Sequence, residues 1–189
     1  MTVRSDLVLP ADVPALTAAQ AAHLAAALRR NSTLKTLRFS QLGLCEDGSD
    51  VPVALIDALV GHPSLRYLII CFDAVPEDAR AAVGAAVGRL VAANAPKFAE
   101  LEGMDMDAVG LQPLIDALPH NTHLQYLDCR GNCAATQPIG AALAAAVRQN
   151  TSLTYFAAGE ADHADLIAAA QFIEQRTDDA DAAAEAAQA

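Results

Sequence analysis

The chain has 189 residues, enough for one compact domain or two very small ones. Apolar residues make up 53%, but 44 of the residues are Ala and Trp is absent, which favours closely packed helices with small residues at their contacts. The net charge of −11 repels a phosphate backbone, and no basic run is longer than Arg29-Arg30, so nucleic acid and anionic membrane are both excluded as expected partners.

The amino-terminal residues lack the basic-then-apolar layout of a signal peptide. No uncharged run in the middle of the chain reaches the roughly 20 residues that cross a bilayer. The four cysteines, at positions 45, 71, 129 and 133, are then most simply reduced thiols. We therefore expect a cytoplasmic protein, with export as an effector without a classical signal peptide as the alternative.

Helix boundaries are visible along the chain. The sequence Thr17-Ala-Ala-Gln20 forms a capping-box pattern that predicts a helix to about Arg30. Pro52 and Pro76 suit first-turn positions of helices that reach about residues 60 and 93. A short helix is predicted over 111–118. The last two helices are predicted to be capped by Thr136 and Asp162 and to end near Gln149 and Arg176.

Five segments with the pattern L-x-x-L-x-L lie between these helices. They begin at Leu34, Leu65, Phe98, Leu124 and Leu153, so the pattern recurs with a period of roughly 30 residues. Asn or His precedes four of them by three positions, at Asn31, His62, Asn121 and Asn150, and Asn94 precedes the other by four. Strand and helix therefore alternate, and this order predicts parallel strands joined by crossover helices.

The segment from Asn121 to Asn132, with Leu124, Leu127 and Cys129 at its inward positions, is close throughout to the consensus of leucine-rich repeats. The chain resembles the ribonuclease-inhibitor-like class of that family, including its Ala-rich bacterial members. The resemblance implies an α/β fold, a right-handed curved solenoid of about five strand–helix repeats. Parallel strands would line its concave face and helices its convex face. Stacking of such units buries apolar faces that one unit leaves exposed.

The domain organisation follows from the repeats. Residues 1–176 are expected to form one leucine-rich repeat domain. It would comprise an amino-terminal capping unit over 1–33, repeats over 34–161, and a capping helix over 162–176. Residues 177–189 contain no large apolar residue, so they are expected to form an acidic Ala-rich tail or a frayed extension of the last helix.

Strand alternation places the third, fifth and seventh positions of each segment on the concave surface. The three tyrosines of the chain all occupy the third position, where they suit protein recognition, although aromatic residues also simply favour strands. Acidic residues in the middle favour a basic or mixed peptide surface, or else form a solvated acidic face. The predicted partner-binding residues are Tyr67, Ile69, Glu100, Glu102, Met104, Tyr126, Asp128, Arg130 and Tyr155.

The closeness in sequence of His120 and His123 to Cys129 and Cys133 raises the question of a zinc site. Zinc needs four ligands around one point, within about 2–2.3 Å. The histidines enter the predicted strand and the cysteines leave it, so the two pairs would lie roughly 20 Å apart. We expect no metal site and no cofactor.

The sequence gives little evidence for a catalytic site. Cys71 is the only cysteine on the predicted concave face, and its neighbours there include no base. Glu100 and Glu102 lie about 6.5–7 Å apart on one strand, which suits a glycosidase, but any charged strand has such pairs. Gly84 and Gly88 lie inside a helix rather than in a phosphate-binding loop, where they favour close packing. We expect no enzyme activity.

The resemblance implies a module that binds a protein partner through its concave strand face. Related Ala-rich effectors are sometimes fused to a ubiquitin-ligase domain, for which no residues remain here. One alternative is a regulator of an enzyme such as a small GTPase, acting through the loop residues Arg130 and Asn132. Another is a structural scaffold that forms homo-oligomers, because an exposed terminal strand could pair edge to edge.

Overall fold

The computed structural model describes residues 5–9, 16–40, 50–71, 75–93, 95–132, 137–158 and 164–187. Within these ranges, six strands form a single parallel sheet in which their spatial order equals their chain order. The strands are β1 (Asp6–Leu9), β2 (Thr36–Ser40), β3 (Tyr67–Cys71), β4 (Phe98–Glu102), β5 (Tyr126–Asp128) and β6 (Tyr155–Ala157). The predicted parallel, alternating α/β arrangement is confirmed.

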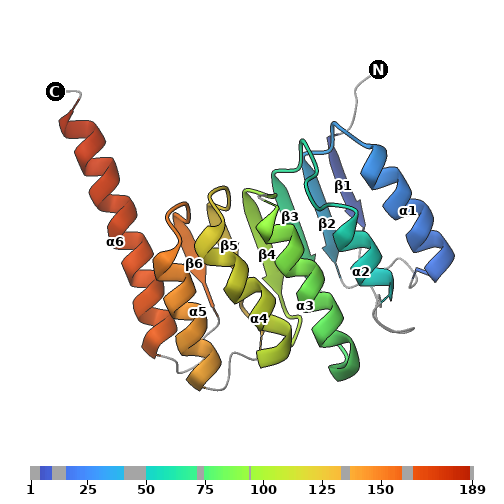
Figure 1. Ribbon diagram of the computed structural model, residues 1–189. Helices are drawn as coiled ribbons and strands as arrows, with labels where there is room; N and C mark the ends of the chain where they lie inside the picture. Colours follow the sequence, from blue (N-terminus) through green and yellow to red (C-terminus); the bar gives the residue numbers. More distant parts are fainter. Residues whose placement is uncertain are drawn as a thin grey trace.

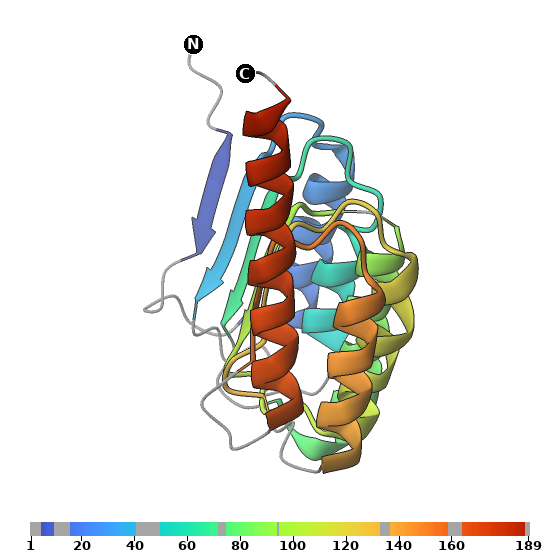
Figure 2. The same cartoon turned by 90° about the vertical axis from the view of Figure 1, so that its left-hand side faces the viewer.

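Six α-helices of the described chain alternate with the strands and lie on one side of the sheet (Figures 1 and 2). They are α1 (Ala18–Arg30), α2 (Asp50–Asp57), α3 (Glu77–Ala92), α4 (Ala108–Ala117), α5 (Gln137–Gln149) and α6 (Ala164–Ala186), and a short 3₁₀ turn, η1 (Leu118–His120), follows α4. None of the described helices is both long and apolar enough to cross a membrane. None of the described helices covers the other side of the sheet, which we call the open face (Figure 2).

Local sequence signals set the helix starts. Thr17 caps α1 by accepting a hydrogen bond from the Gln20 backbone N–H, and the Gln20 side chain accepts one from the Thr17 backbone N–H, which confirms the capping box. Pro52 lies in the first turn of α2, and Pro76 directly precedes α3. The caps predicted at Thr136 and Asp162 lie outside the described residues, although α5 does end at Gln149 as predicted.

The core lies between the sheet and the helix layer. Alternate side chains of each strand point into it, and those of β2 and β3 are completely buried: Leu37, Phe39, Leu68 and Ile70. Because successive side chains of a strand alternate between faces, these rows leave the intervening residues on the open face. The third and fifth positions therefore each form a row of side chains that runs across all six described strands.

Glycines let α3 and α4 approach each other closely. A Cβ atom added at Gly84 would lie 2.1 Å from the backbone oxygen of Gly110. A Cβ atom at Gly88 would lie 2.6 Å from the Cβ of Pro113. Both distances are far shorter than a van der Waals contact, so the predicted packing role of Gly84 and Gly88 is confirmed.

The strand register corrects the predicted frame of the third segment. Phe98 pairs with Tyr67 on one side and Tyr126 on the other, so it occupies the third position rather than the first. The first position belongs to Pro96, which is buried where other segments have Leu. With this frame, residues paired across neighbouring strands are spaced more evenly along the chain than the segment starts indicated.

Buried amides tie the start of each later strand to the preceding unit. The Oδ1 atom of Asn150 accepts hydrogen bonds from the backbone N–H groups of Ser152 and Leu153, and its Nδ2 donates to the carbonyls of Leu118 and Asn121. Asn121 accepts two bonds in the same way and donates to a carbonyl of α3. This use of Asn explains why the residue recurs three positions before the segments.

His62 takes the same place between α2 and β3. Its Nδ1 accepts from the backbone N–H groups of Ser64 and Leu65, but its buried Nε2 atom has no hydrogen-bond partner within the described chain. Burial lowers the pKa of His62 below 6.5, while the carbonyls of Asn31 and Leu28 act in the opposite direction. At this position His62 therefore accepts the same two backbone hydrogen bonds as an Asn, but it does not donate to a carbonyl of the described chain as Asn121 and Asn150 do.

The two ends of the sheet differ. At the amino-terminal end, β1 is the edge strand among the described strands, and α1 follows it. At the other end, α6 packs beside β6 and α5 and continues helically to Ala186, so its last turns extend past α5 (Figure 1). Of the two alternatives for residues 177–186, the helix extension is the one observed.

Candidate functional site on the open face

One row of aromatic side chains crosses the open face. Tyr67, Phe98, Tyr126 and Tyr155 stand in register on β3 to β6, and we call them the aromatic row. The ring centroids of Tyr67 and Phe98 are 4.5 Å apart at an interplanar angle of 14°, and those of Tyr126 and Tyr155 are 4.3 Å apart at 5°. Between these stacked pairs, Phe98 and Tyr126 are tilted at 6.1 Å.

The predicted alignment of the three tyrosines is therefore confirmed, and Phe98 is a fourth member that the sequence frame missed. Tyr67 and Tyr155 remain 44% and 45% exposed. Burial raises the pKa of Tyr126, as do nearby Tyr155 and Asp128, so its phenol stays protonated near neutral pH. The row offers a large apolar area with hydroxyl groups that can still donate hydrogen bonds.

Residues of β3 and β4 extend the surface toward the carboxyl ends of the strands. A shallow cavity of about 240 Å³ lies over the row and is lined by Tyr67, Ile69, Phe98, Glu100 and Tyr126. Ile69 and Glu100 are half-buried and adjacent in the register, and Glu102 is exposed at the end of β4. These predicted site residues are brought together as expected, although the two glutamates occupy the fifth and seventh positions, not the third and fifth.

Two predicted site residues are not available on this face. Met104 is 1% exposed, because β4 ends at Glu102 and Gly103 turns the chain with a positive φ of 72°, which ends the strand alternation. Asp128 is also 1% exposed, because its carboxylate is held by Arg130. The Arg130 Nε and Nη2 atoms lie 2.9 and 2.7 Å from Asp128 Oδ2, and the Arg130 backbone N–H donates to Oδ1.

The ion pair of Asp128 with Arg130 removes one of the negative charges that the sequence predicted for the middle of the open face. Only Arg130 of the pair is exposed, and its side chain is 52% accessible. Hydrogen bonding to Asp128 raises the pKa of the already cationic guanidinium. The acidic character of the described open face therefore comes from Glu100 and Glu102 on β4 and from Asp6 on β1, whereas Asp128 serves to hold the turn after β5.

Three cations lie at the opposite, amino-terminal ends of the strands. Lys35, Arg66 and Lys97 each directly precede a strand, and they stand in register because Arg66 N–H donates to Lys35 O and Lys97 N–H donates to Arg66 O. We call these three residues the basic rim. Lys35 and Arg66 are exposed and Lys97 is half-buried. Within the described part of the chain, no hydrogen bond, ion pair or ring contact engages their side chains.

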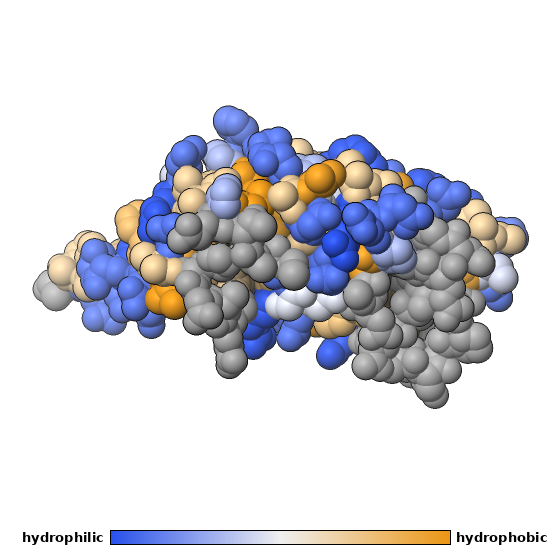
Figure 3. All heavy atoms as spheres, turned by 90° about the horizontal axis from the view of Figure 1, so that it is seen from below, coloured by the Kyte–Doolittle hydropathy of each residue, from blue (hydrophilic) through white to orange (hydrophobic). Residues whose placement is uncertain are grey.

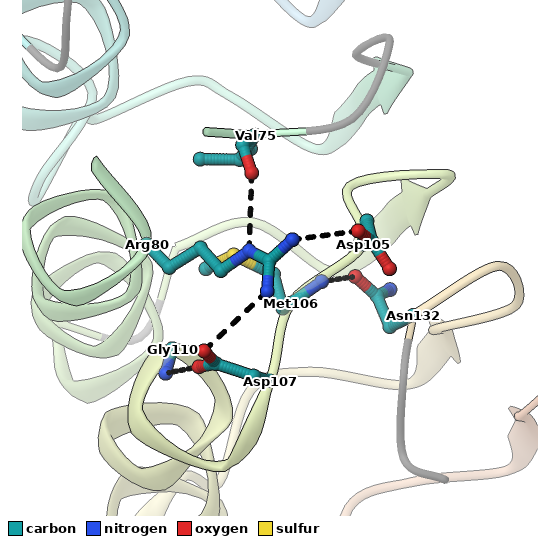
Figure 4. Close-up of polar contacts among 7 residues, drawn as sticks. All are labelled: Val75, Arg80, Asp105, Met106, Asp107, Gly110 and Asn132. Atoms are coloured by element: carbon teal, nitrogen blue, oxygen red, sulfur yellow. Dashed lines mark hydrogen bonds and ion pairs between the residues drawn. The ribbon is translucent and has the colours of Figure 1, made fainter. Parts of the chain in front are cut away.

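The loops at the carboxyl ends of the strands hold a connected polar network (Figure 4). The Arg80 guanidinium lies 2.6 Å from Asp105 Oδ2 and 3.5 Å from Asp107 Oδ2, and its Nε donates to the carbonyl of Val75. Asp107 caps α4 by accepting from the Gly110 N–H, which, with Arg80, lowers the pKa of this carboxyl. Figure 3 views this end of the molecule, where hydrophilic side chains alternate with smaller hydrophobic patches.

Asn132, one of the two loop residues considered as an enzyme-regulating site, is engaged inside the molecule. Its Nδ2 donates to the carbonyls of Leu101 and Cys129, at 2.6 and 3.0 Å, and its Oδ1 accepts from Met106 N–H at 3.2 Å. The side chain therefore links the loops that follow β4 and β5. This leaves Arg130 as the exposed member of that loop candidate.

The described cysteines are not activated. Cys71 is half-buried at the end of β3, and burial and the neighbouring Glu102 raise the pKa of its thiol. Cys129 is buried, and its pKa is raised by that burial. A raised pKa lowers the fraction of thiolate, the nucleophilic form. Among the described residues, no three His, Cys, Asp or Glu side chains are grouped to hold a metal ion, and Cys45 and Cys133 lie outside them.

A second hollow, of about 520 Å³, lies between the open-face end of β6 and α6. Tyr155 and Ala157 line its sheet side, and Ile167 and Ala170 line its helix side. The hollow is therefore continuous with the end of the aromatic row.

The outer edge of the sheet beside β6 is partly covered by α6. Arg176 donates to the carbonyls of Asn150 and Leu153, and Thr177 donates to that of Thr154. Occupied carbonyls oppose the edge-to-edge pairing considered for a scaffold, because another strand would need them.

The comparisons with known proteins add no relationship. No model of a known protein family matches the chain, and no curated protein matches it.

Proposed function

We propose that the chain is a protein-binding module of the leucine-rich repeat type, which binds its partner through the open face of the sheet. The observation that carries the proposal is the aromatic row, with two tyrosines that remain 44% and 45% exposed. Aromatic side chains dominate the energy of protein interfaces because they bury large areas at little entropic cost. No catalytic residue or cofactor enters the proposal.

We further propose that the repeated units form a right-handed curved solenoid with the open face on its concave side. Residues at equivalent places recur at nearly even spacing along the chain on all six described strands. Helices are about 10 Å wide whereas strands are about 4.8 Å apart, so stacked strand–helix units favour curvature toward the strands. Right-handed crossovers are by far the commoner hand for parallel strands.

A cytoplasmic location completes the proposal. The described cysteines, Cys71 and Cys129, are both unpaired thiols, and Cys129 is buried in the core. Reducing compartments keep such thiols unoxidised. The partner is accordingly sought in a cytoplasmic extract.

Affinity capture with matched variants tests the proposal. We compare the wild type with a Tyr67→Ala, Tyr155→Ala double variant and with a Val109→Ala, Phe172→Ala control, which removes exposed apolar side chains from helices instead. The open-face variant is expected to retain less than about a tenth of the captured partner, and the control nearly all of it. Equal melting temperatures ensure that folding is not the cause. Capture lost only in the helix variant would contradict the proposal.

A further inference from the structure

The chemistry of the partner is inferred from three sets of residues along the strands: the basic rim, the aromatic row and the glutamates of β4. This inference rests on the proposed function. The basic rim runs along the amino ends of β2 to β4, and the aromatic row runs beside it. Glu100 and Glu102 lie on the other side of that row. Along β4, a partner that spans this face meets Lys97 first, then the Phe98 ring, then the two glutamates, whereas β2 carries Thr36 and Arg38 at the same outward positions.

The basic rim differs from three arginines elsewhere in the described chain. Elsewhere in the described molecule, Arg80, Arg89 and Arg130 are each held by an aspartate at 2.6–2.8 Å. The three rim cations have no such partner among the described residues, although the chain carries a net charge of −11. Their mutual repulsion at neighbouring strand positions is relieved when anionic groups lie against them. The rim therefore complements an acidic surface.

The geometry favours a helix as the segment that lies on the rows. Neighbouring strands are about 4.8 Å apart, and the turns of an α-helix are about 5.4 Å apart, so acidic residues one turn apart follow successive rim cations. Same-side residues of an extended peptide recur only about every 6.6–6.8 Å and lose the register within three strands. Lys97, directly before β4, and Glu100, within β4, are three positions apart along the chain, or about 10 Å, which is the width of a helix.

The aromatic row disfavours flat ligands. Tyr67 stacks on Phe98 and Tyr126 stacks on Tyr155, so most ring faces are turned toward each other and their edges point outward. Nucleic-acid bases need exposed ring faces on which to stack. Aliphatic side chains of a helix instead pack well against ring edges and hydroxyl groups.

We infer that the partner contributes an amphipathic helix that lies across the strands along the aromatic row, with acidic side chains spaced by one turn against Lys35, Arg66 and Lys97. Its apolar stripe packs on the rings and ends in the hollow beside Tyr155 and Ile167. From β2 to β6 the rows span four strand intervals, or about 19 Å, so the contact requires about 13 helical residues.

Two fluorescent helix-forming peptides, each slightly longer than this contact, test the inference directly. Both carry the same leucine stripe and a neutral Gln flank, and the second flank is Glu in one peptide and Lys in the other. Fluorescence anisotropy is expected to show at least about tenfold tighter binding of the Glu peptide, and weaker binding as salt rises. Equal affinity of the two peptides, tighter binding of the Lys peptide, or no binding of the Glu peptide at about 1 mM protein, roughly the weakest specific contact to be expected, would overturn the inference.

Matched variants then locate the contact. Arg66→Gln with Lys97→Gln is expected to weaken the Glu peptide about threefold to tenfold. A control of Arg29→Gln with Arg148→Gln, exposed on α1 and α5, removes the same charge and is expected to change little. The inference is also overturned if both double variants weaken the peptide equally, since net charge would then be the cause.

A short oligouridylate serves as the contrasting probe. Tighter binding of this single-stranded RNA than of the Glu peptide would overturn the inference in favour of a nucleic-acid surface. Failure of the inference is distinguishable from failure of the proposed function: if captured protein is still lost in the tyrosine variant but the Glu peptide does not bind, the open face binds a partner of other chemistry.

Discussion

The two ends of the strands treat their charges in opposite ways. At the carboxyl ends, Arg80 is satisfied by Asp105 and Asp107, and Arg130 by Asp128. At the amino ends, the basic rim has no partner within the described chain. The first end uses its charges to fix loops, whereas the second carries cations that no described side chain pairs with. Changes to internal contacts should therefore alter stability, and changes to the rim should alter binding.

The largest expected effect on stability comes from the close contact between α3 and α4. Gly84→Ala places a Cβ atom 2.1 Å from the Gly110 oxygen, so α3 and α4 must move apart. We expect the free energy of unfolding to fall by about 3 kcal/mol or more, measured by urea denaturation. The control Ala82→Gly, at a half-buried position of α3, should cost only about 1 kcal/mol. A smaller loss at Gly84 than at Ala82 would disprove this tight packing.

The asparagines that precede the strands provide the next comparison, between one that both donates and accepts hydrogen bonds and one that accepts them. Asn150 is completely buried and both donates and accepts hydrogen bonds, whereas Asn31 is half-buried and accepts from Thr33 and Leu34. We expect Asn150→Ala to cost about 3 kcal/mol and Asn31→Ala about 1 kcal/mol in urea denaturation. Equal costs at the two sites would show that the carbonyl contacts of Asn150 contribute little.

His62 gives a pH-dependent version of the same comparison. Because its folded pKa is lowered below 6.5, the unfolded chain binds the proton more readily, and stability falls as pH drops below about 6.5. His62→Asn supplies an amide that can donate to the carbonyls of Leu28 and Asn31, as Asn150 donates in its own unit. We expect a gain of about 1 kcal/mol at pH 5.5 and a smaller gain at pH 8. A gain that does not change with pH would contradict the role assigned to protonation.

The smallest expected effect concerns Asp107, which caps α4 and contacts Arg80. The Gly110 N–H and Arg80 lower the pKa of Asp107 below 3.8, so its contribution to stability is present above that pH and is lost as pH falls through the lower folded value. Asp107→Ser keeps a capping oxygen but removes the titration. Acid unfolding followed by circular dichroism should be shallower below about pH 4 in this variant. An unchanged acid profile would show that the cap holds without its charge.

Much of this architecture could be predicted from the sequence, because Leu spacing and the Thr17 capping box report local geometry directly. The third segment could not be framed correctly, since Pro96 stands where a Leu was expected and Phe98 fits the apolar pattern in its place. The error displaced Glu100, Glu102 and Met104 by two positions.

The misplaced frame also concealed the basic rim. Lys97 takes its place beside Arg66 only when Phe98 pairs with Tyr67. The burial of Asp128 could not be predicted from the sequence either, because it depends on how the Arg130 side chain folds back in the following turn. Such contacts are set by three-dimensional closure rather than by spacing along the chain.

Fluorine NMR gives the most direct test of the open face as the binding surface, because the three tyrosines of the chain all belong to the aromatic row. In protein labelled with 3-fluorotyrosine, saturation with the captured partner is expected to shift or broaden the signals of Tyr67, Tyr126 and Tyr155. Labelling with fluorophenylalanine should show a change at Phe98 and none at Phe172 on α6. Three unchanged tyrosine signals in the saturated complex would contradict the account.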